Sequence, residues 1–170
     1  PVGAAYEDTS ANAWVLGLLV QTVAAQPYAA YVQQQVFVPL DMRQSFTAPA
    51  DAQSHGLGTG YHYWFGQPVA AEQPFNRGYL PGSGLIASAE DMTHFLAAQL
   101  NSGRYGSASV LSAAGIAALH QPAVAAPGPH AECLTQVTDC AYAMGWGVRP
   151  INGAAAVIKS SDLPLFAADV

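Results

Sequence analysis

The sequence predicts a single helix-rich domain with a few short strands late in the chain. Its 170 residues, 51% of them hydrophobic, are enough to bury the core of one domain. Apolar residues recur at helical spacing in three segments before residue 101. Two short apolar runs near the end are separated by Asn152 and Gly153, a pair typical of a tight hairpin turn.

The composition excludes some classes of partner. Only 9% of the residues are charged, against about 25% in average soluble proteins. The formal net charge is −6 and no basic patch is present, which argues against binding to nucleic acid. No apolar run reaches the roughly 18 residues of a membrane-spanning helix. The longest, residues 11–25, is predicted to be a buried helix of a soluble domain.

The first half of the chain predicts two helices followed by a loop and a strand. Asp8, Thr9 or Ser10 is expected to cap the first helix, and Pro27 and Pro39 bound the second. Residues 47–60 and 66–73 are rich in small and turn-forming residues and are predicted to be loops. The aromatic residues 61–65 between them predict a strand.

Residues 78–92 form the most clearly bounded segment. A glycine-rich turn leads to Ser88, which is predicted to cap a helix by accepting a hydrogen bond from the backbone N–H of Asp91. Glu90 and Asp91 suit the positive end of that helix, and Gly103 suits its C-terminal turn. Ser83 lies between glycines but lacks the G-x-S-x-G pattern of an exposed nucleophile, so we interpret it as a turn residue.

The histidines and cysteines do not predict a metal site or a cofactor. The five histidines are scattered and lack the i, i+4 spacing of helical ligands. Cys133 and Cys140 lack the paired C-x-x-C spacing of a zinc site. Their spacing fits either a small disulfide loop in an oxidising compartment or two unpaired thiols.

Lys159 is the most suggestive charged residue because it is the only lysine in the chain. It follows the apolar strand predicted at residues 154–158 and precedes Ser160, Ser161 and Asp162. A cation beside hydroxyls at a strand end suits binding of a substrate carboxylate or polarisation of a nucleophile. The alternative is a lysine that only increases solubility.

The order of several motifs resembles the middle and late part of the serine β-lactamase-like superfamily, which includes class C β-lactamases, penicillin-binding proteins and related esterases. The resemblance covers nearly the whole chain except residues 123–141. The matching stretches are residues 1–17, residues 28–42 with Pro39-Leu40-Asp41-Met42, residues 81–103, residues 119–122 together with 142–146, and Lys159-Ser160-Ser161.

The resemblance implies an α+β fold, with a mostly helical subdomain packed against part of an antiparallel sheet. Residues 1–170 are then expected to be a partial domain that lacks the N-terminal nucleophile segment and the C-terminal strands and helix. The implied reaction is acyl transfer on an amide or ester through an acyl-serine. We expect a bacterial serine hydrolase fragment that is inactive alone. The alternatives are a non-catalytic module that binds a peptide, a cell-wall ligand or a partner protein, and a degenerate product without a stable fold.

The same resemblance assigns candidate site residues and shows where the sequence departs from the family. The family's Ser-x-x-Lys is absent, and Lys159-Ser160-Ser161 falls where the family carries Lys-Thr-Gly or His-x-Gly. Lys159 and Ser160 would then be catalytic residues that help to bind substrate or assist proton transfer. Asp8 and Ser10 stand where the family has the tyrosine and asparagine of Tyr-x-Asn. Asp8 would be catalytic and Ser10 would bind substrate, although a carboxyl group of pKa ~4 is a poor substitute for a phenol of pKa ~10. Ser161 replaces a glycine at the strand edge that would bind substrate.

The implied partners are a small-molecule or peptide substrate and the remainder of the chain's own domain. The implied location is periplasmic, secreted or membrane-associated.

Overall fold

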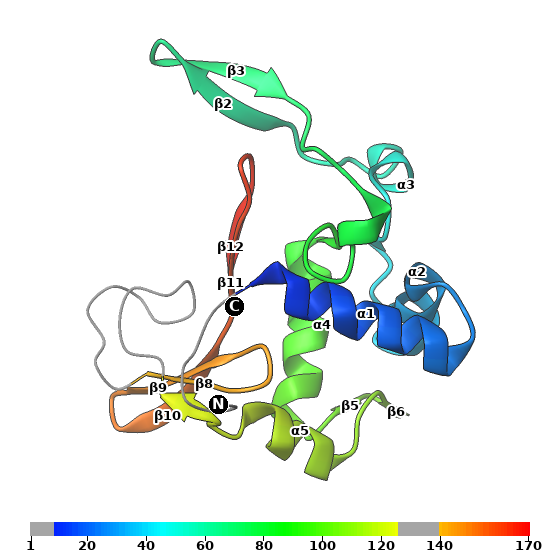
Figure 1. Cartoon of the computed structure of the whole chain (residues 1–170), viewed down its shortest axis with the longest axis vertical. Coiled ribbons are helices and arrows are strands. Elements are labelled where there is room, and N and C mark those ends of the chain that lie inside the picture. Colours follow the sequence, from blue (N-terminus) through cyan, green and yellow to red (C-terminus); the bar gives the residue numbers. More distant parts are fainter. Residues whose placement is uncertain (1–8, 126–139) are drawn as a thin grey trace. The chain divides into compact units, whose positions relative to one another are not determined.

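The computed structural model describes residues 9–125 and 140–170. They form two units, which we call the helical unit (residues 9–112) and the sheet unit (residues 113–170). The content agrees with the predicted helix-rich α+β class, because helices occur with small antiparallel sheets in both units (Figure 1). Asp8, one of the predicted site residues, lies outside the described residues.

The helical unit begins with the two helices that the periodicity predicts. Thr9 is the N-cap of the first, and its Oγ1 accepts a hydrogen bond from the backbone N–H of Ala11 at 3.3 Å. Pro39 follows the second helix and has no N–H with which to extend it. The helices of this unit are α1 (Ser10–Ala24), α2 (Tyr28–Val32), the π-helical η1 (Gln33–Phe37), α3 (Pro49–Gln53), the 3₁₀ turn η2 (Arg77–Tyr79) and α4 (Ala89–Leu100).

The main core of the helical unit lies between the α2–η1 helix and α4. Leu40 is completely buried there, in the turn that follows η1, and Ala98 contributes from α4. Ala98 is small enough to let neighbouring elements approach closely. The other buried members of this cluster are Val32, Phe37 and Met42.

A buried carboxylate joins the start of α4 to the short strand β1 (Ser45–Phe46). Asp91 is 4% exposed, and its Oδ2 accepts hydrogen bonds from the backbone N–H of Gln44 at 2.7 Å and from the Ser45 hydroxyl at 2.6 Å. Ser45 in turn pairs with Ala87 of β4 (Ile86–Ala87). The Ser88 hydroxyl accepts from the N–H of Asp91 at 3.1 Å, which confirms the predicted cap.

Two segments predicted to be loops contain a helix or a strand. Pro49 starts the single-turn helix α3, for which its fixed φ is favourable. Residues 67–71 form the strand β3 (Gln67–Ala71), which pairs with β2 (Gly60–Trp64). The loop prediction for residues 66–73 was therefore wrong, because cross-strand pairing with the aromatic strand outweighs the low strand propensity of its Pro and Ala residues. The short strands β5 (Arg104–Tyr105) and β6 (Ala108–Ser109) complete the unit.

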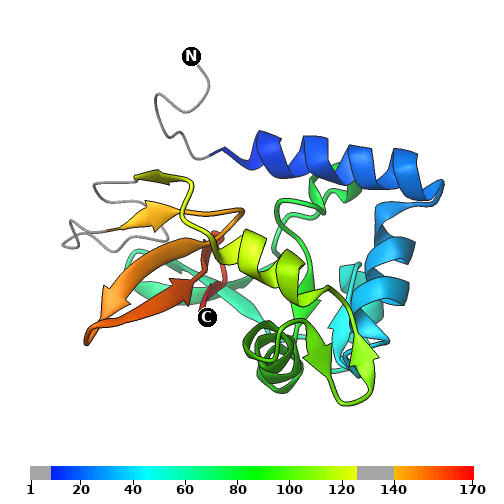
Figure 2. The same ribbon diagram turned by 90° about the horizontal axis from the view of Figure 1, so that it is seen from below.

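In its described residues, the sheet unit contains one helix, a four-stranded antiparallel sheet and a separate hairpin (Figure 2). Asn152 and Gly153 both have positive φ, as the predicted two-residue turn between β9 and β10 requires. The strand order in the sheet is β10-β9-β8-β7, and β11 pairs only with β12. The elements are α5 (Ala113–His120), β7 (Val124–Ala125), β8 (Ala141–Tyr142), β9 (Gly147–Ile151), β10 (Ala154–Ile158), β11 (Ser160–Asp162) and β12 (Ala167–Asp169).

Cys140, just before β8, is disulfide-bonded. This agrees with the disulfide alternative for this cysteine. The predicted partner, Cys133, lies outside the described residues.

The first helix differs from its prediction in burial. Among the residues of α1, only Gly17 is buried, whereas the predicted buried face is open to solvent; Val23, for example, is 79% exposed. In the described residues, no single helix is long and apolar enough to cross a bilayer, and α1 meets that test only jointly with Tyr28–Phe37, at a bend of 79°. The exposed apolar residues of α1 are Val15, Leu16, Leu18, Leu19 and Val23.

Candidate functional site

The Lys159 segment lies at the junction of two strands. β10 ends at Ile158 and β11 begins at Ser160, so Lys159 stands between them in extended backbone. Its N–H donates to the carbonyl of Val170 at 2.9 Å, and the N–H of Val170 donates to the carbonyl of Lys159 at 3.0 Å. This reciprocal pair fixes the backbone of the candidate lysine.

The three candidate residues of this segment do not share one face. Side chains alternate along a strand, so Lys159 and Ser161 lie on one face and Ser160 on the other. The cross-strand pairs agree, because Ser160 is opposite Asp169 and Ser161 is opposite Ala168. Lys159 is half-buried and Ser161 is exposed. The lysine and the second serine are thus the pair that a ligand on one face would meet together.

The opposite face contains a hollow of about 280 Å³ that the sequence did not reveal. Ser160 and Asp169 line it together with Arg149, Ile158 and Val170. The Nε of Arg149 is buried and has no hydrogen-bond partner. An unpaired buried N–H costs stability, so this guanidinium beside a hydroxyl and a carboxylate is a second polar group of interest. The only signal in the sequence was that Arg149 is one of five basic residues and directly follows the first of the two apolar runs that flank Asn152 and Gly153.

Ser10, the remaining candidate, is the exposed first residue of α1 in the helical unit. The start of α1 packs on the glycine-rich segment, where Trp14 stacks on Tyr79 with ring centroids 4.6 Å apart. A Cβ on Gly82 would lie 2.8 Å from Trp14 Nε1 and 3.4 Å from the carbonyl oxygen of Ser10. Gly82 is thus required for close approach to the Ser10 end of the helix.

Ser83 has a backbone role in the same segment. The N–H groups of Gly82 and Ser83 both donate to the carbonyl of Tyr79, at 3.0 and 2.9 Å. This arrangement agrees with the interpretation of Ser83 as a turn residue.

Three of the five candidates, Lys159, Ser160 and Ser161, lie in the sheet unit as neighbours in the chain, with Lys159 and Ser161 on one face and Ser160 on the other. Ser10 belongs to the helical unit and is described within it. In residues 9–125 and 140–170, no group of three or more His, Cys, Asp or Glu side chains is arranged to hold a metal ion.

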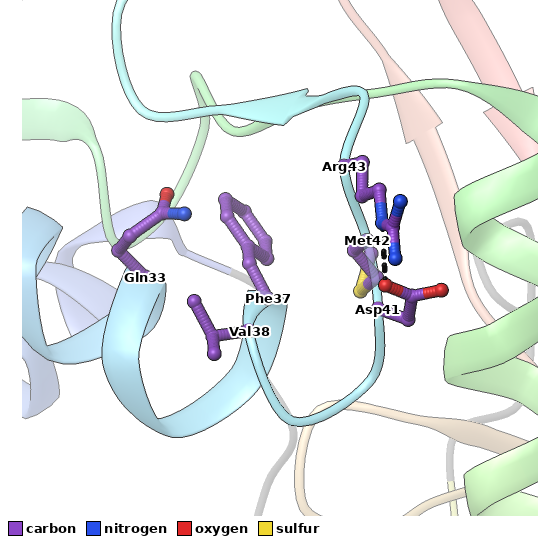
Figure 3. Close-up of a pocket in the computed structure, with 6 residues that line it drawn as sticks. All are labelled: Gln33, Phe37, Val38, Asp41, Met42 and Arg43. Atoms are coloured by element: carbon purple, nitrogen blue, oxygen red, sulfur yellow. Dashed lines mark hydrogen bonds and ion pairs between the residues drawn. The ribbon is translucent and has the colours of Figure 1, made fainter.

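A second hollow, of about 240 Å³, lies beside η1 in the helical unit (Figure 3). Its rim carries the ion pair of Arg43 and Asp41, whose Nε and Oδ1 are 2.6 Å apart. The hydrogen bond that Arg43 donates to Asp41, aided by the negative charge of Asp41, raises the pKa of the Arg43 guanidinium, so this group stays fully charged. Phe37 and Met42 at this hollow belong to the core, and none of the four candidate site residues that the structure describes lines it.

Known proteins with similar folds are penicillin-binding proteins and β-lactamases. An octameric penicillin-binding protein homologue from Pyrococcus abyssi superposes with a TM-score of 0.85 at 18% identity, over 98% of this chain and 35% of its own. A class C β-lactamase from Rhodobacter sphaeroides superposes with a TM-score of 0.70 at 16% identity, over 94% of this chain and 49% of its own.

A similarity in sequence points the same way. Protein flp of Staphylococcus aureus (strain MW2) is 29% identical over 99 residues, which are 58% of this chain and 20% of that protein. The chain thus spans a fifth of this curated relative, and a third to a half of the two solved structures.

The family model for β-lactamases matches residues 2–166, which is nearly the full length. The chain belongs to the β-lactamase family.

Proposed function

We propose that this chain supplies the later part of the acyl-transfer site of a serine hydrolase of the β-lactamase family, and that it is inactive alone. The observation that carries the proposal is a family match over residues 2–166 in a sequence that contains no Ser-x-x-Lys. The only lysine is Lys159, and position 156, three residues before it, is alanine. The acylated serine must then come from a segment outside these 170 residues.

In the proposed reaction, the hydroxyl oxygen of that serine attacks the carbonyl carbon of an amide or ester. The amine or alcohol departs with a proton, and water then releases the acid and regenerates the serine. Lys159 contributes a positive charge at a fixed point of the β10–β11 junction. It would stabilise negative charge on the substrate or assist transfer of the serine proton.

The other candidates have subsidiary roles in this proposal. Ser161 shares the face of Lys159 and would donate a hydrogen bond to the substrate there. Ser160 is on the opposite face, which favours a role in holding the strand over direct contact with the same ligand. Asp8 and Ser10 are candidates on the family resemblance alone.

The exposed face of α1 supports the involvement of a further segment. Five large apolar residues lie on one side of this helix and are open to solvent. Surfaces of this kind are usually interaction sites. We propose that the remainder of a β-lactamase domain covers this face, and that a small-molecule or peptide substrate binds the completed site. The disulfide at Cys140 favours an oxidising compartment, outside the cytoplasm.

One feature favours a second candidate, a non-catalytic module that binds a peptide, a cell-wall ligand or a partner protein. Ser161 places an exposed side chain on β11 where the family carries glycine. A side chain there narrows the approach of a substrate backbone to the strand edge. A ligand that is bound but not cleaved fits this arrangement.

Turnover of nitrocefin and p-nitrophenyl acetate tests the proposal. We expect the 170-residue chain to hydrolyse neither substrate above the buffer rate. Joined to a Ser-x-x-Lys segment of the family, it should gain activity that Lys159→Ala abolishes and Lys159→Arg partly retains. Activity of the isolated chain that disappears in Lys159→Ala would refute the claim that the chain is inactive. Binding without turnover in the joined protein would favour the non-catalytic module.

A further inference from the structure

The hairpin formed by β2 and β3 has an unusual surface for a soluble protein. Most of its large side chains are exposed, and exposure is greatest at the turn, where Phe65 is 91% exposed. Figure 1 shows the hairpin as a separate pair of strands, and neither strand pairs with any other in the described part of the chain. We call residues 60–71 the aromatic hairpin. Its exposed large side chains are Tyr61, Tyr63, Trp64, Phe65 and Val69.

The tip of the hairpin is a two-residue turn that exposes an aromatic side chain. Phe65 and Gly66 form the two-residue turn, with φ of +47° and +77°. Positive φ at both positions is the signature of the type I′ turn, which suits the twist of the two strands. Positive φ is energetically unfavourable for a bulky residue, so Phe65 strains the backbone at the first position of this turn. The rings of Trp64 and Phe65 form an edge-to-face pair, with centroids 5.3 Å apart.

The aromatic groups occupy both faces of the hairpin as well as its tip. Tyr61 and Tyr63 lie on one face and His62 and Trp64 on the other, because side chains alternate along β2. A protein that docked against one face would leave the aromatic groups of the other in water. An occupant that surrounds the tip would cover both faces.

The lack of charged residues in the hairpin indicates what kind of partner would cover its tip. No Asp, Glu, Lys or Arg occurs between residues 52 and 71, so the hairpin can leave bulk water without desolvating a formal charge. Trp and Tyr are the residues that concentrate at the interface between lipid headgroups and acyl chains. We propose that the tip of the aromatic hairpin inserts into the interfacial layer of a zwitterionic lipid bilayer. This contact is independent of the proposed chemistry at Lys159.

Vesicle binding by the 170-residue chain tests the proposal. With phosphatidylcholine vesicles, the chain should co-sediment, and its tryptophan emission should shift to shorter wavelength. Lipids brominated near the headgroup should quench the part of the emission that Trp64→Phe removes. The formal net charge of −6 predicts no tighter binding to phosphatidylglycerol vesicles.

The double variant Trp64→Ser/Phe65→Ser should partition about tenfold more weakly or worse, since it removes two large apolar groups from the contact. Leu100→Ser is the matched control, because Leu100 is 86% exposed at the end of α4, outside the hairpin, and this variant should bind normally. Lys159→Ala should also bind normally, which separates this proposal from the enzymatic one. Circular dichroism identical to that of the starting protein would show that each variant is folded.

Three results would overturn the proposal. One is equal vesicle binding by the double variant. Another is binding that Leu19→Ser on α1 weakens as strongly as the double variant does. The last is that the chain does not bind vesicles but self-associates with increasing concentration, and that the double variant abolishes this self-association. The hairpin would then bind a second copy of the chain.

Discussion

Replacement of Asp91 tests whether a buried carboxylate holds the helical unit together at the start of α4. In Asp91→Ala, the Gln44 N–H and the Ser45 hydroxyl lose the acceptor that they meet at 2.7 and 2.6 Å. A hydrogen bond to a charged group contributes ~1.5–3 kcal/mol, so two such bonds give about 3–6 kcal/mol. Whole domains have stabilities of only ~5–15 kcal/mol. We therefore expect Asp91→Ala to fold poorly.

The quantitative comparison uses Asp91→Asn, which keeps the size and one acceptor oxygen but removes the charge. We expect it to lower the free energy of unfolding by about 1–3 kcal/mol, as the two bonds become weaker. Glu90→Gln is the matched control, because Glu90 is exposed in the same first turn and loses at most ~1 kcal/mol of helix-dipole stabilisation.

Urea unfolding followed by circular dichroism, with tryptophan fluorescence as a second probe, measures both variants. Coincident transitions would justify a two-state free energy. If the free energies of unfolding of Asp91→Asn and Asp91→Ala both lie within about 0.5 kcal/mol of that of Glu90→Gln, the hydrogen bonds to the buried carboxylate are not what joins β1 to α4.

Three further substitutions have definite outcomes in thermal or urea unfolding. Gly17→Ala should lower the free energy of unfolding by about 1–3 kcal/mol, since the new Cβ would lie 2.1 Å from the Pro81 ring. The cost of this overpacking exceeds the ~1 kcal/mol by which alanine is favoured over glycine in a helix. A more stable variant would mean that the Pro81 ring moves aside freely. Ser88→Ala should lower the free energy of unfolding by ~1 kcal/mol, because the helix loses its N-cap, whereas Ser88→Thr should be close to the starting protein. Equal losses of stability in the two variants would contradict the capping role. Arg43→Gln should leave the unfolding midpoint unchanged because its ion pair with Asp41 is exposed, and a clear fall would show that the pair has a structural role.

Elements with local signals were predictable from the sequence. The Ser88 cap, the turn at Asn152 and Gly153, and the turn at Gly103 that follows α4 each depend on a few neighbouring residues whose backbone preferences decide the structure. The family resemblance, which depends on the order of such signals, is confirmed by the family match.

Features that depend on distant residues were not predictable in the same way. The sequence predicts only a helix-dipole role for the Asp91 side chain, because the groups that its carboxylate binds are 46 and 47 residues away in the chain. β3 was assigned to a loop because its stability comes from pairing with β2. Nothing in the local sequence predicts that Arg149 lies beside Ser160, because this depends on the pairing of β9 with β10. The predicted burial of α1 was wrong because periodicity identifies an apolar face without identifying what covers it.

Acylation of a serine hydrolase that contains this chain is the most direct test of the proposed function. A Ser-x-x-Lys segment of the family is joined to residues 1–170, and intact mass is recorded after exposure to nitrocefin. We predict one covalent adduct on the serine of Ser-x-x-Lys, strongly reduced in Lys159→Ala and absent from the 170-residue chain alone. An adduct on the isolated chain, or an acylation rate unchanged in Lys159→Ala, would contradict this prediction.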